Sequence, residues 1–154
     1  MQISTLLPAE RIMLYDPEGK SKEDLIVELF DVAARTSGLS DHIDVIRGAL
    51  LEREASMSTG IGQGVAIPHC SSEYVSEVHG ALALLPRGIE FQSVDEEPVR
   101  VAVLLLLPKN KFEKHIKTLA AVARLFNNQD FRETILGSTS PERAAELIAE
   151  AEGA

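Results

Sequence analysis

The sequence lacks several features that would each define a functional class. It has 154 residues with a single cysteine, Cys70, which excludes an intramolecular disulfide and favours a reducing compartment such as the cytoplasm. Its formal charge is −9, so the clusters of Lys and Arg that bind nucleic acids or anionic membranes are not expected. Neither a nucleic-acid partner nor a role at a membrane surface is therefore predicted.

Long hydrophobic runs are also missing. Residues 1–8 have no basic start followed by a long apolar block, so we expect no secretory signal. The longest apolar run, Val101–Leu107, is much shorter than the roughly 20 residues of a membrane-spanning helix, so no membrane insertion is predicted. Without repeats or linkers, and with 45% hydrophobic residues, the chain predicts one domain over residues 1–154.

Common catalytic motifs are absent as well. The four histidines and one cysteine show neither H-x-x-x-H nor C-x-x-C spacing, so no metal site is predicted. The sequence has no G-x-S-x-G elbow of a serine hydrolase. It has no glycine-rich P-loop ending in Gly-Lys-Ser/Thr either.

Helical spacing is present in the first third of the chain. Ser21 with acidic residues after it predicts a helix over about 22–36, and Gly38 is expected to end it. Ser40 is expected to cap a second helix that continues to about residue 54.

Three more helices are predicted in the last third. Asn110 and Glu113 have the spacing of a capping box, and His115 lies beside the apolar stripe of the helix that follows. A short helix is expected over about 131–136, and Ser140-Pro141 opens the last one. The predicted apolar stripe consists of Phe112, Ile116, Leu119, Ala123 and Phe126.

The middle of the chain predicts strands. They cover about 65–67, 78–85 and 99–107, with a turn at Pro86-Arg87-Gly88. Because the apolar residues of Val101–Leu107 are contiguous, this strand is expected to be covered on both faces. The predicted fold class is therefore α/β, a mixed β-sheet sandwiched between helices on both faces.

The segment Ser58–His69 is the most informative one. Its three glycines allow tight turns, a short apolar strand follows, and Pro68 is expected to stop that strand just before His69. A neutral imidazole held on stiff backbone at a strand end is a suitable nucleophile, and we expect it to attack phosphorus.

A phosphorylated histidine needs donors nearby, because it carries up to two added negative charges. Arg53 offers a planar fork that matches phosphate oxygens, and His115 lies near a helix end that favours anions. Ser58 and Thr59 could donate hydroxyl hydrogen bonds to the phosphoryl group. Each residue also has an ordinary structural explanation, as a buried histidine, a helix-end cation or a turn hydroxyl.

Together these residues resemble the enzyme IIA domains of the bacterial phosphoenolpyruvate-dependent phosphotransferase system, of the fructose/mannitol and nitrogen-related type. The resemblance implies a mixed sheet flanked by helices and no metal or organic cofactor. The segments that carry it are Arg53-Glu54, Ser58–His69, Gly88–Phe91, Pro98-Val99, Leu104–Pro108 and His115–Leu119.

By this resemblance, His69 is the phosphorylated residue, and the histidine-containing phosphocarrier protein is its donor. His115 would orient the His69 ring or bind the phosphoryl group, and Arg53 would neutralise its charge. The acceptor would be a IIB domain, or a regulated target protein. Asp95-Glu96-Glu97-Pro98 departs from the Asp-Gly turn of many relatives, so this loop is expected to differ.

Three functions remain open at this point. The first is a phosphocarrier for sugar uptake, which passes its phosphoryl group to a IIB cysteine. The second is a nitrogen-related regulator whose partner affinity depends on phosphorylation. The third is a catalytically inactive binding module. Cys70 follows His69 directly and is expected to face the opposite side, as a small packing residue.

Overall fold

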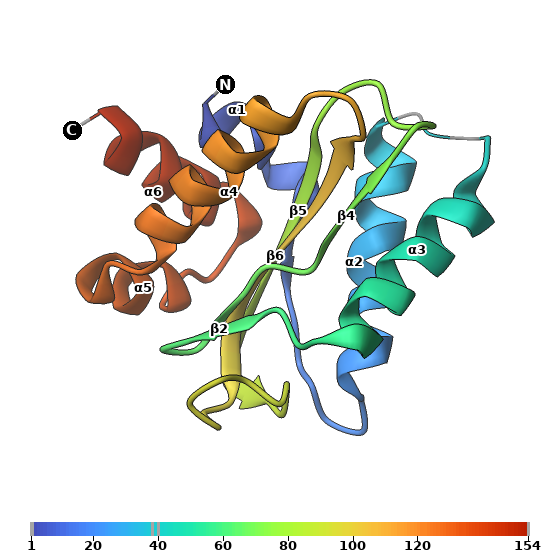
Figure 1. Cartoon of the computed structure of the whole chain (residues 1–154). Coiled ribbons are helices and arrows are strands. Elements are labelled where there is room, and N and C mark those ends of the chain that lie inside the picture. The colour runs from blue at the N-terminus through green and yellow to red at the C-terminus, as the bar shows by residue number, and fades with distance from the viewer. Residues whose placement is uncertain (1, 38, 40, 154) are drawn as a thin grey trace.

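The computed structural model describes residues 2–37, 39 and 41–153, and shows helices packed on both faces of a mixed sheet (Figure 1). The described strands form one six-stranded sheet in the order β1-β5-β6-β3-β2, with β4 also paired to β6. This arrangement confirms the predicted α/β class. The elements are α1 Ile3–Leu6, η1 Ala9–Arg11, β1 Ile12–Leu14, α2 Lys22–Ser37, α3 Ile43–Ser56, β2 Gly60–Gly62, β3 Val65–Ala66, β4 His69–Ser72, β5 His79–Ile89, β6 Val99–Pro108, α4 Phe112–Phe126, α5 Gln129–Leu136 and α6 Pro141–Gly153.

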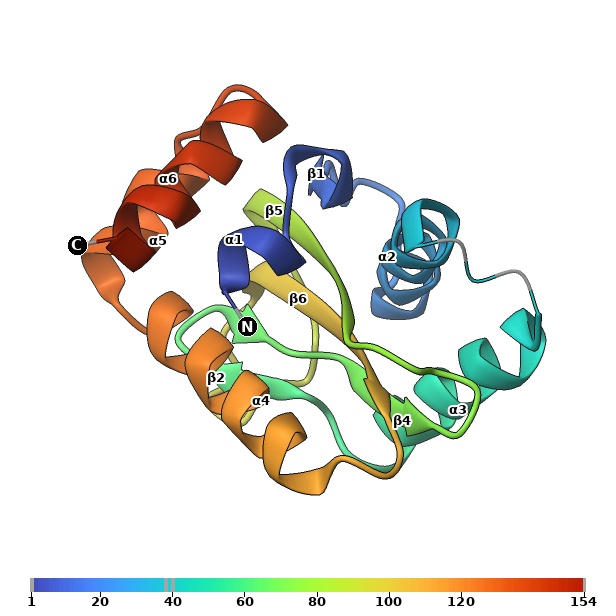
Figure 2. The same cartoon turned by 90° about the horizontal axis from the view of Figure 1, so that it is seen from above.

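Strand β6 is the centre of the sheet and is buried on both faces. It pairs antiparallel with β5 and parallel with β3 and β4. Its alternate side chains Ala102, Leu104 and Leu106 pack in the core beneath α2 and α3. Those between them, such as Val103 and Leu105, pack in a second core beneath α1, α4, α5 and α6 on the other face (Figure 2). The unbroken apolar run therefore marks a strand covered on both sides, as predicted.

Polar side chains cap four of the described helices, and in α5 Asn128 Oδ1 accepts from the Phe131 N–H at 3.0 Å. Ser21 Oγ accepts from the Asp24 N–H at 3.1 Å, and Asp24 Oδ2 accepts from the Ser21 N–H at 3.0 Å, which is a reciprocal capping box at the start of α2. Ser140 Oγ accepts from an N–H in the first turn of α6. The carboxylate of Glu152, near the end of α6, accepts from the N–H groups of Ile3 and Ser4 at 2.5 and 2.7 Å and so caps α1.

The start of α3 lies later than the sequence predicts. The predicted stop at Gly38 and the predicted cap at Ser40 both lie outside the described residues. Helix α3 begins at Ile43, after His42 in the left-handed region at φ 61°, and no side chain of His42 caps it.

The turn predicted at Pro86-Arg87-Gly88 is wrong, because these residues lie within strand β5. The chain does not reverse there, because β5 continues through Ile89, which pairs with Val99 of β6. The register shifts between Leu84 and Ile89, and Gly88 has φ 74°. The proline, which lacks an N–H, and the glycine therefore form an irregular bulge within one strand.

Helix α4 begins without the predicted capping box. Lys111 precedes its first residue, and no side chain caps that end, so the Asn110–Glu113 prediction is wrong.

The face that α4 buries also differs from the predicted stripe. Its buried residues are His115, Val122 and Phe126. By contrast, Phe112 and Ile116 are 73% and 50% exposed. The first half of the predicted stripe therefore faces solvent, and His115 takes the buried position. None of the helices in the described ranges combines the length and the apolar character that crossing a membrane requires.

Candidate functional site

His69 is the first residue of β4. Strands β3 and β4 pair with β6 in one continuous register. The prediction that Pro68 stops the strand before His69 is therefore wrong, because the proline only interrupts it. The Leu105 N–H donates to the Pro68 carbonyl at 2.9 Å, which holds the interrupted segment on the sheet. The backbone of His69 is therefore fixed on both sides.

The His69 ring is oriented by its own strand. Nδ1 lies 2.7 Å from the carbonyl oxygen of Ile67. Because a carbonyl only accepts hydrogen bonds, Nδ1 carries the proton of the neutral ring, and Nε2 keeps its lone pair. The partly exposed ring therefore presents Nε2 with a free lone pair.

His69 shares a pocket of about 360 Å³ with three of the other four predicted site residues. The pocket is formed by the end of α3, the segment that leads into β2, the start of β4 and one face of α4. Most of the remaining lining is apolar. The lining residues are Arg53, Ser58, Thr59, Ile61, Ile67, His69, Leu119, Ala120 and Ala123.

The polar side chains of this pocket make hydrogen bonds to nearby backbone. Arg53 donates to the Met57 carbonyl at 2.8 Å, which leaves other N–H groups of its guanidinium for a ligand. Ser58 Oγ donates to the Phe91 carbonyl at 2.7 Å. These contacts are the ordinary structural roles considered for the two residues, and they also hold both side chains in place at the pocket.

A buried ionic network lies behind the side of the pocket that Arg53, Ser58 and Thr59 form. Glu54 accepts from the Thr59 N–H at 2.9 Å and from the Thr59 hydroxyl at 2.5 Å. Lys22 Nζ lies 3.0 Å from Glu54, and their side chains are 9% and 3% exposed. Lys22 also donates to the Phe91 carbonyl at 3.3 Å. The network ties α2, the end of α3 and the 58–59 segment together.

Sequence reasoning noted Glu54 only as part of the Arg53-Glu54 pair and missed this role. The available signal was a glutamate on the helix turn next to the candidate phosphate ligand. Its burial depends on Lys22, which lies 32 positions earlier in the chain.

Glycine is required at positions 60, 62 and 64 for different structural reasons. A Cβ on Gly60 would lie 2.2 Å from Ser93 Oγ and 3.0 Å from the Ser93 backbone, so only glycine fits there. Gly62 and Gly64 have φ values of 95° and 80° in the tight turn between β2 and β3. These glycines do provide the sharp turns that the sequence predicted.

The loop that departs from the expected Asp-Gly turn packs against this hairpin. Asp95 accepts from the N–H groups of Gln63 and Glu97 at 2.8 and 3.1 Å, and these bonds lower the pKa of its carboxyl group. Glu96 takes φ 63°, the left-handed conformation that a glycine would adopt more easily. The turn therefore forms, with a glutamate in a glycine-like conformation.

His115 lies on α4, the helix that contributes Leu119, Ala120 and Ala123 to the pocket, but His115 itself does not line the pocket. It is 7% exposed, burial lowers its pKa, and its Nε2 has no hydrogen-bond partner among the described residues. Cys70 packs in the opposite core, as expected for the residue after His69, and burial raises the pKa of its thiol to about 11.

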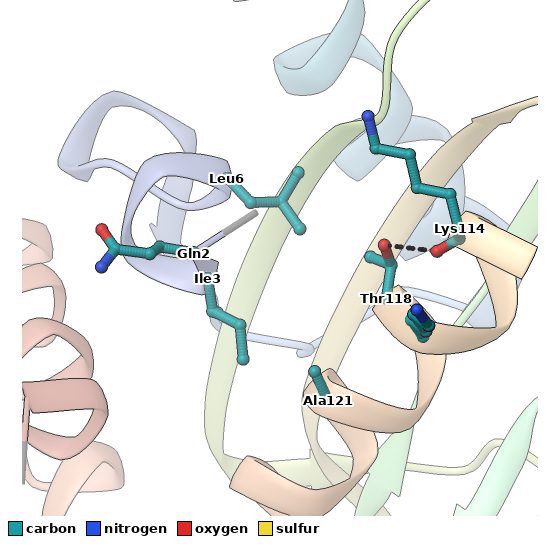
Figure 3. Close-up of a pocket in the computed structure, with 7 residues that line it drawn as sticks. Gln2, Ile3, Leu6, Lys114, Thr118 and Ala121 are labelled. Atoms are coloured by element: carbon teal, nitrogen blue, oxygen red, sulfur yellow. Dashed lines mark hydrogen bonds between the residues drawn. The ribbon is translucent and has the colours of Figure 1, made fainter.

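A second cavity lies on the other side of α4, between this helix and α1 (Figure 3). Ile3, Leu6 and Ala121 give it apolar walls, and Lys114 lies at its edge. It contains none of the predicted site residues. Within the described residues, no three His, Cys, Asp or Glu side chains gather where they could hold a metal ion.

Comparison with known proteins identifies a family for almost the whole chain. The family model described as phosphoenolpyruvate-dependent sugar phosphotransferase system, EIIA 2, matches residues 5–151. The fructose-specific EIIA component of Haloferax volcanii is 36% identical over 148 residues, which cover 96% of this chain and 95% of that protein. A nitrogen regulatory protein of Bradyrhizobium diazoefficiens is 34% identical over 151 residues, covering 97% and 95%.

Solved structures show the same fold. The nitrogen regulatory protein IIA-Ntr of Neisseria meningitidis superposes with a TM-score of 0.83 at 35% identity, covering 95% of this chain and 98% of that one. Enzyme IIA mannitol of Escherichia coli, in its complex with phosphorylated enzyme IIB mannitol, gives a TM-score of 0.76 at 20% identity, covering 94% and 97%. The second likeness concerns the fold alone.

Proposed function

Because the chain belongs to the EIIA 2 family of the phosphoenolpyruvate-dependent sugar phosphotransferase system, we propose that it carries a phosphoryl group on Nε2 of His69. The observation that supports this most directly is the contact between His69 Nδ1 and the Ile67 carbonyl, since it leaves Nε2 with a free lone pair in a pocket. The donor is the histidine-containing phosphocarrier protein.

The transfer needs no external base. The Nε2 lone pair attacks phosphorus, the phosphorus–nitrogen bond to the donor histidine breaks, and the electron pair of that bond returns to the donor ring. The proton on His69 Nδ1 stays in place, and the Ile67 carbonyl stabilises the positive charge that develops on the ring.

The other site residues stabilise the added charge. Arg53 turns its free N–H groups to the phosphoryl oxygens. His115, on the helix that forms one side of the pocket, offers the phosphoryl group its Nε2, which has no hydrogen-bond partner among the described residues. The hydroxyls of Ser58 and Thr59 already donate to the Phe91 carbonyl and the Glu54 carboxylate. These two residues therefore act by fixing the shape of the segment that borders the phosphoryl group.

Two acceptors fit this chemistry. The likeness to a fructose-specific component favours a IIB cysteine and sugar uptake, whereas the likeness to nitrogen regulatory proteins favours a regulated target protein. Either partner would meet this domain in the cytoplasm, a reducing compartment that suits the single free cysteine, Cys70. Turnover of label to a purified IIB protein with a named sugar distinguishes the first acceptor from the second.

The test is phosphorylation with phosphoenolpyruvate, enzyme I and the phosphocarrier protein, followed by intact mass and radiolabel. We expect one acid-labile phosphoryl group on the wild type and on His42→Ala, a matched change of an exposed histidine. The His69→Ala variant should carry none. If a competent relay labels none of the three, the inactive binding module becomes the better explanation.

A further inference from the structure

The cavity between α1 and α4 is separate from the His69 pocket (Figure 3). It has a volume of about 260 Å³ and shares no lining residue with that pocket. Its α4 residues have the spacing i, i+3, i+4 and i+7, so they form one face of the helix, whereas the residues of α4 that line the His69 pocket lie on another face. We name it the α1–α4 cavity, and its lining residues are Gln2, Ile3, Leu6, Lys114, Lys117, Thr118 and Ala121.

The interior of the α1–α4 cavity is apolar and its α1 wall is fixed. Ile3 and Leu6 are 6% and 3% exposed. Helix α1 packs closely on β5, since a Cβ on Gly80 would lie 2.9 Å from Leu6 Cγ, and the Glu152 carboxylate ties its first turn to α6. Across the gap, Ala121 of α4 contributes only a methyl group (Figure 3). The space is therefore a built feature of the fold, with a small side chain facing a fixed helix.

The rim of the cavity is basic. Lys114 and Lys117 are exposed, and neither forms an ion pair with any residue that the structure describes. Gln2 adds a side-chain amide, and the described lining residues include no carboxylate. An apolar interior with a few polar groups at one side is typical of small-molecule sites. Here those groups favour a ligand with a hydrocarbon chain and a negatively charged end.

We propose that the α1–α4 cavity binds a small amphiphilic carboxylate. Its hydrocarbon chain packs against Ile3, Leu6 and Ala121, and its carboxylate accepts hydrogen bonds from the ammonium groups of Lys114 and Lys117. An apolar cavity of about 150 Å³ is large enough for a small hydrocarbon, whereas drug-sized ligands occupy about 300–1,000 Å³. The volume of about 260 Å³ therefore fits a short or medium chain. This inference does not depend on the proposed function of His69.

The experiment titrates the full chain with octanoate, below the concentration at which octanoate forms micelles, and follows amide and methyl signals by two-dimensional NMR. Octanol has the same chain without the charge, and acetate has the charge without the chain. One variant combines Lys114→Gln and Lys117→Gln. Its matched control combines Lys109→Gln and Lys111→Gln, which removes two exposed lysines of the same segment that do not line the cavity.

We expect saturable shifts at Ile3, Leu6 and Ala121 with octanoate and none with acetate. Loss of the two charge contacts should weaken binding roughly 3- to 30-fold, both for octanol and for the Lys114/Lys117 variant with octanoate, whereas the control variant should stay within about twofold. Ala121→Leu fills the cavity with a good helix former, so it should abolish binding in a chain whose circular dichroism is unchanged.

Three results overturn the inference. The first is the absence of any saturable shift in the wild type. The second is a set of shifts that gathers at Ile61, Ile67 and Leu119, since this places octanoate in the His69 pocket. The third is equal affinity for octanol and octanoate, because the rim lysines then select no anion. None of them bears on the proposed function, which fails only if the wild type is not labelled.

Discussion

The two walls of the His69 pocket are built in different ways. The wall formed by Arg53, Ser58 and Thr59 is fixed from behind by the buried Lys22–Glu54 pair, and its polar groups have partners within the protein. The α4 wall has exposed apolar side chains, and the Nε2 of His115 on the same helix has no hydrogen-bond partner among the described residues. The first wall holds its polar side chains in fixed positions, whereas the second leaves large apolar side chains exposed.

The largest loss of stability is expected when the carboxylate of Glu54, which supports the Arg53–Thr59 wall from behind, is removed. Glu54→Ala removes the carboxylate that neutralises the buried Lys22 ammonium and leaves it only the Phe91 carbonyl, so we expect a loss of about 3–5 kcal/mol in the free energy of unfolding. Urea denaturation measures it. Glu52→Ala, an exposed glutamate in the same helix, should change stability by less than about 0.5 kcal/mol. Similar values for the two variants would show that the ionic network does not hold this wall.

Gly60 tests the same wall at its closest backbone approach. Gly60→Ala places a methyl group against Ser93, and we expect destabilisation of about 1–3 kcal/mol together with slower phosphorylation. Gly48→Ala is the matched control, because its Cβ meets nothing within 4 Å in the middle of α3, and it should stabilise by about 0.5–1 kcal/mol. Equal signs for the two changes would contradict the packing argument.

Glu96 lies in the loop that supports this wall. Glu96→Gly relieves the left-handed strain but adds freedom to the unfolded chain, so we expect a net gain of about 0.5–1 kcal/mol. Thermal unfolding monitored by circular dichroism measures this gain. A loss of stability would mean that the glutamate side chain makes a contact worth more than its backbone strain.

His115 gives the second wall a pH dependence. Burial lowers its pKa, so the unfolded chain binds a proton more readily than the folded one. Its contribution to stability is complete above the ordinary histidine pKa of about 6.5 and is lost as pH falls below that value. His115→Gln should weaken this dependence, and NMR titration of the ring gives the pKa directly.

The pH test has an internal comparison in His79, whose pKa is also lowered, first by burial and then by Arg11. His115→Gln should therefore leave a residual dependence of the same sign. An NMR midpoint for His115 at or above the ordinary value would contradict the predicted environment of this ring.

The smallest effect on stability is expected at Phe112 and Ile116, the exposed apolar residues of α4. Phe112→Ser and Ile116→Ser should each change the free energy of unfolding by less than about 0.5 kcal/mol, because both side chains already face water. Val122→Ala, on the buried face of the same helix, should cost clearly more. A large loss for either serine variant would place that side chain in the core and remove the contrast between the walls.

Sequence reasoning succeeded where the information is local. The Ser21–Asp24 cap, the doubly buried strand β6 and the segment Ser58–His69 are all encoded in consecutive residues, and each was predicted. The pocket could be anticipated for the same reason, since Arg53 lies only a few positions before that segment.

Prediction from the sequence failed where one local pattern fits two structural environments. The stripe of α4 predicts an amphipathic helix, but periodicity cannot tell a core-facing side from one that meets a partner. Pro86 and Gly88 suit a chain reversal and a bulge equally well. Elements as short as α1, β1 and β2 carry too few residues for any period, and their existence depends on neighbours that are distant in the chain.

The cap that Glu152 provides for α1 links the first turn of the protein to its last. On the ribosome, α1 emerges long before the carboxylate that satisfies its N–H groups, so a growing chain cannot complete this corner. We expect a nascent chain arrested before residue 152 to leave residues 3 and 4 open to protease. The native state is then reached only after residue 152 has been synthesised.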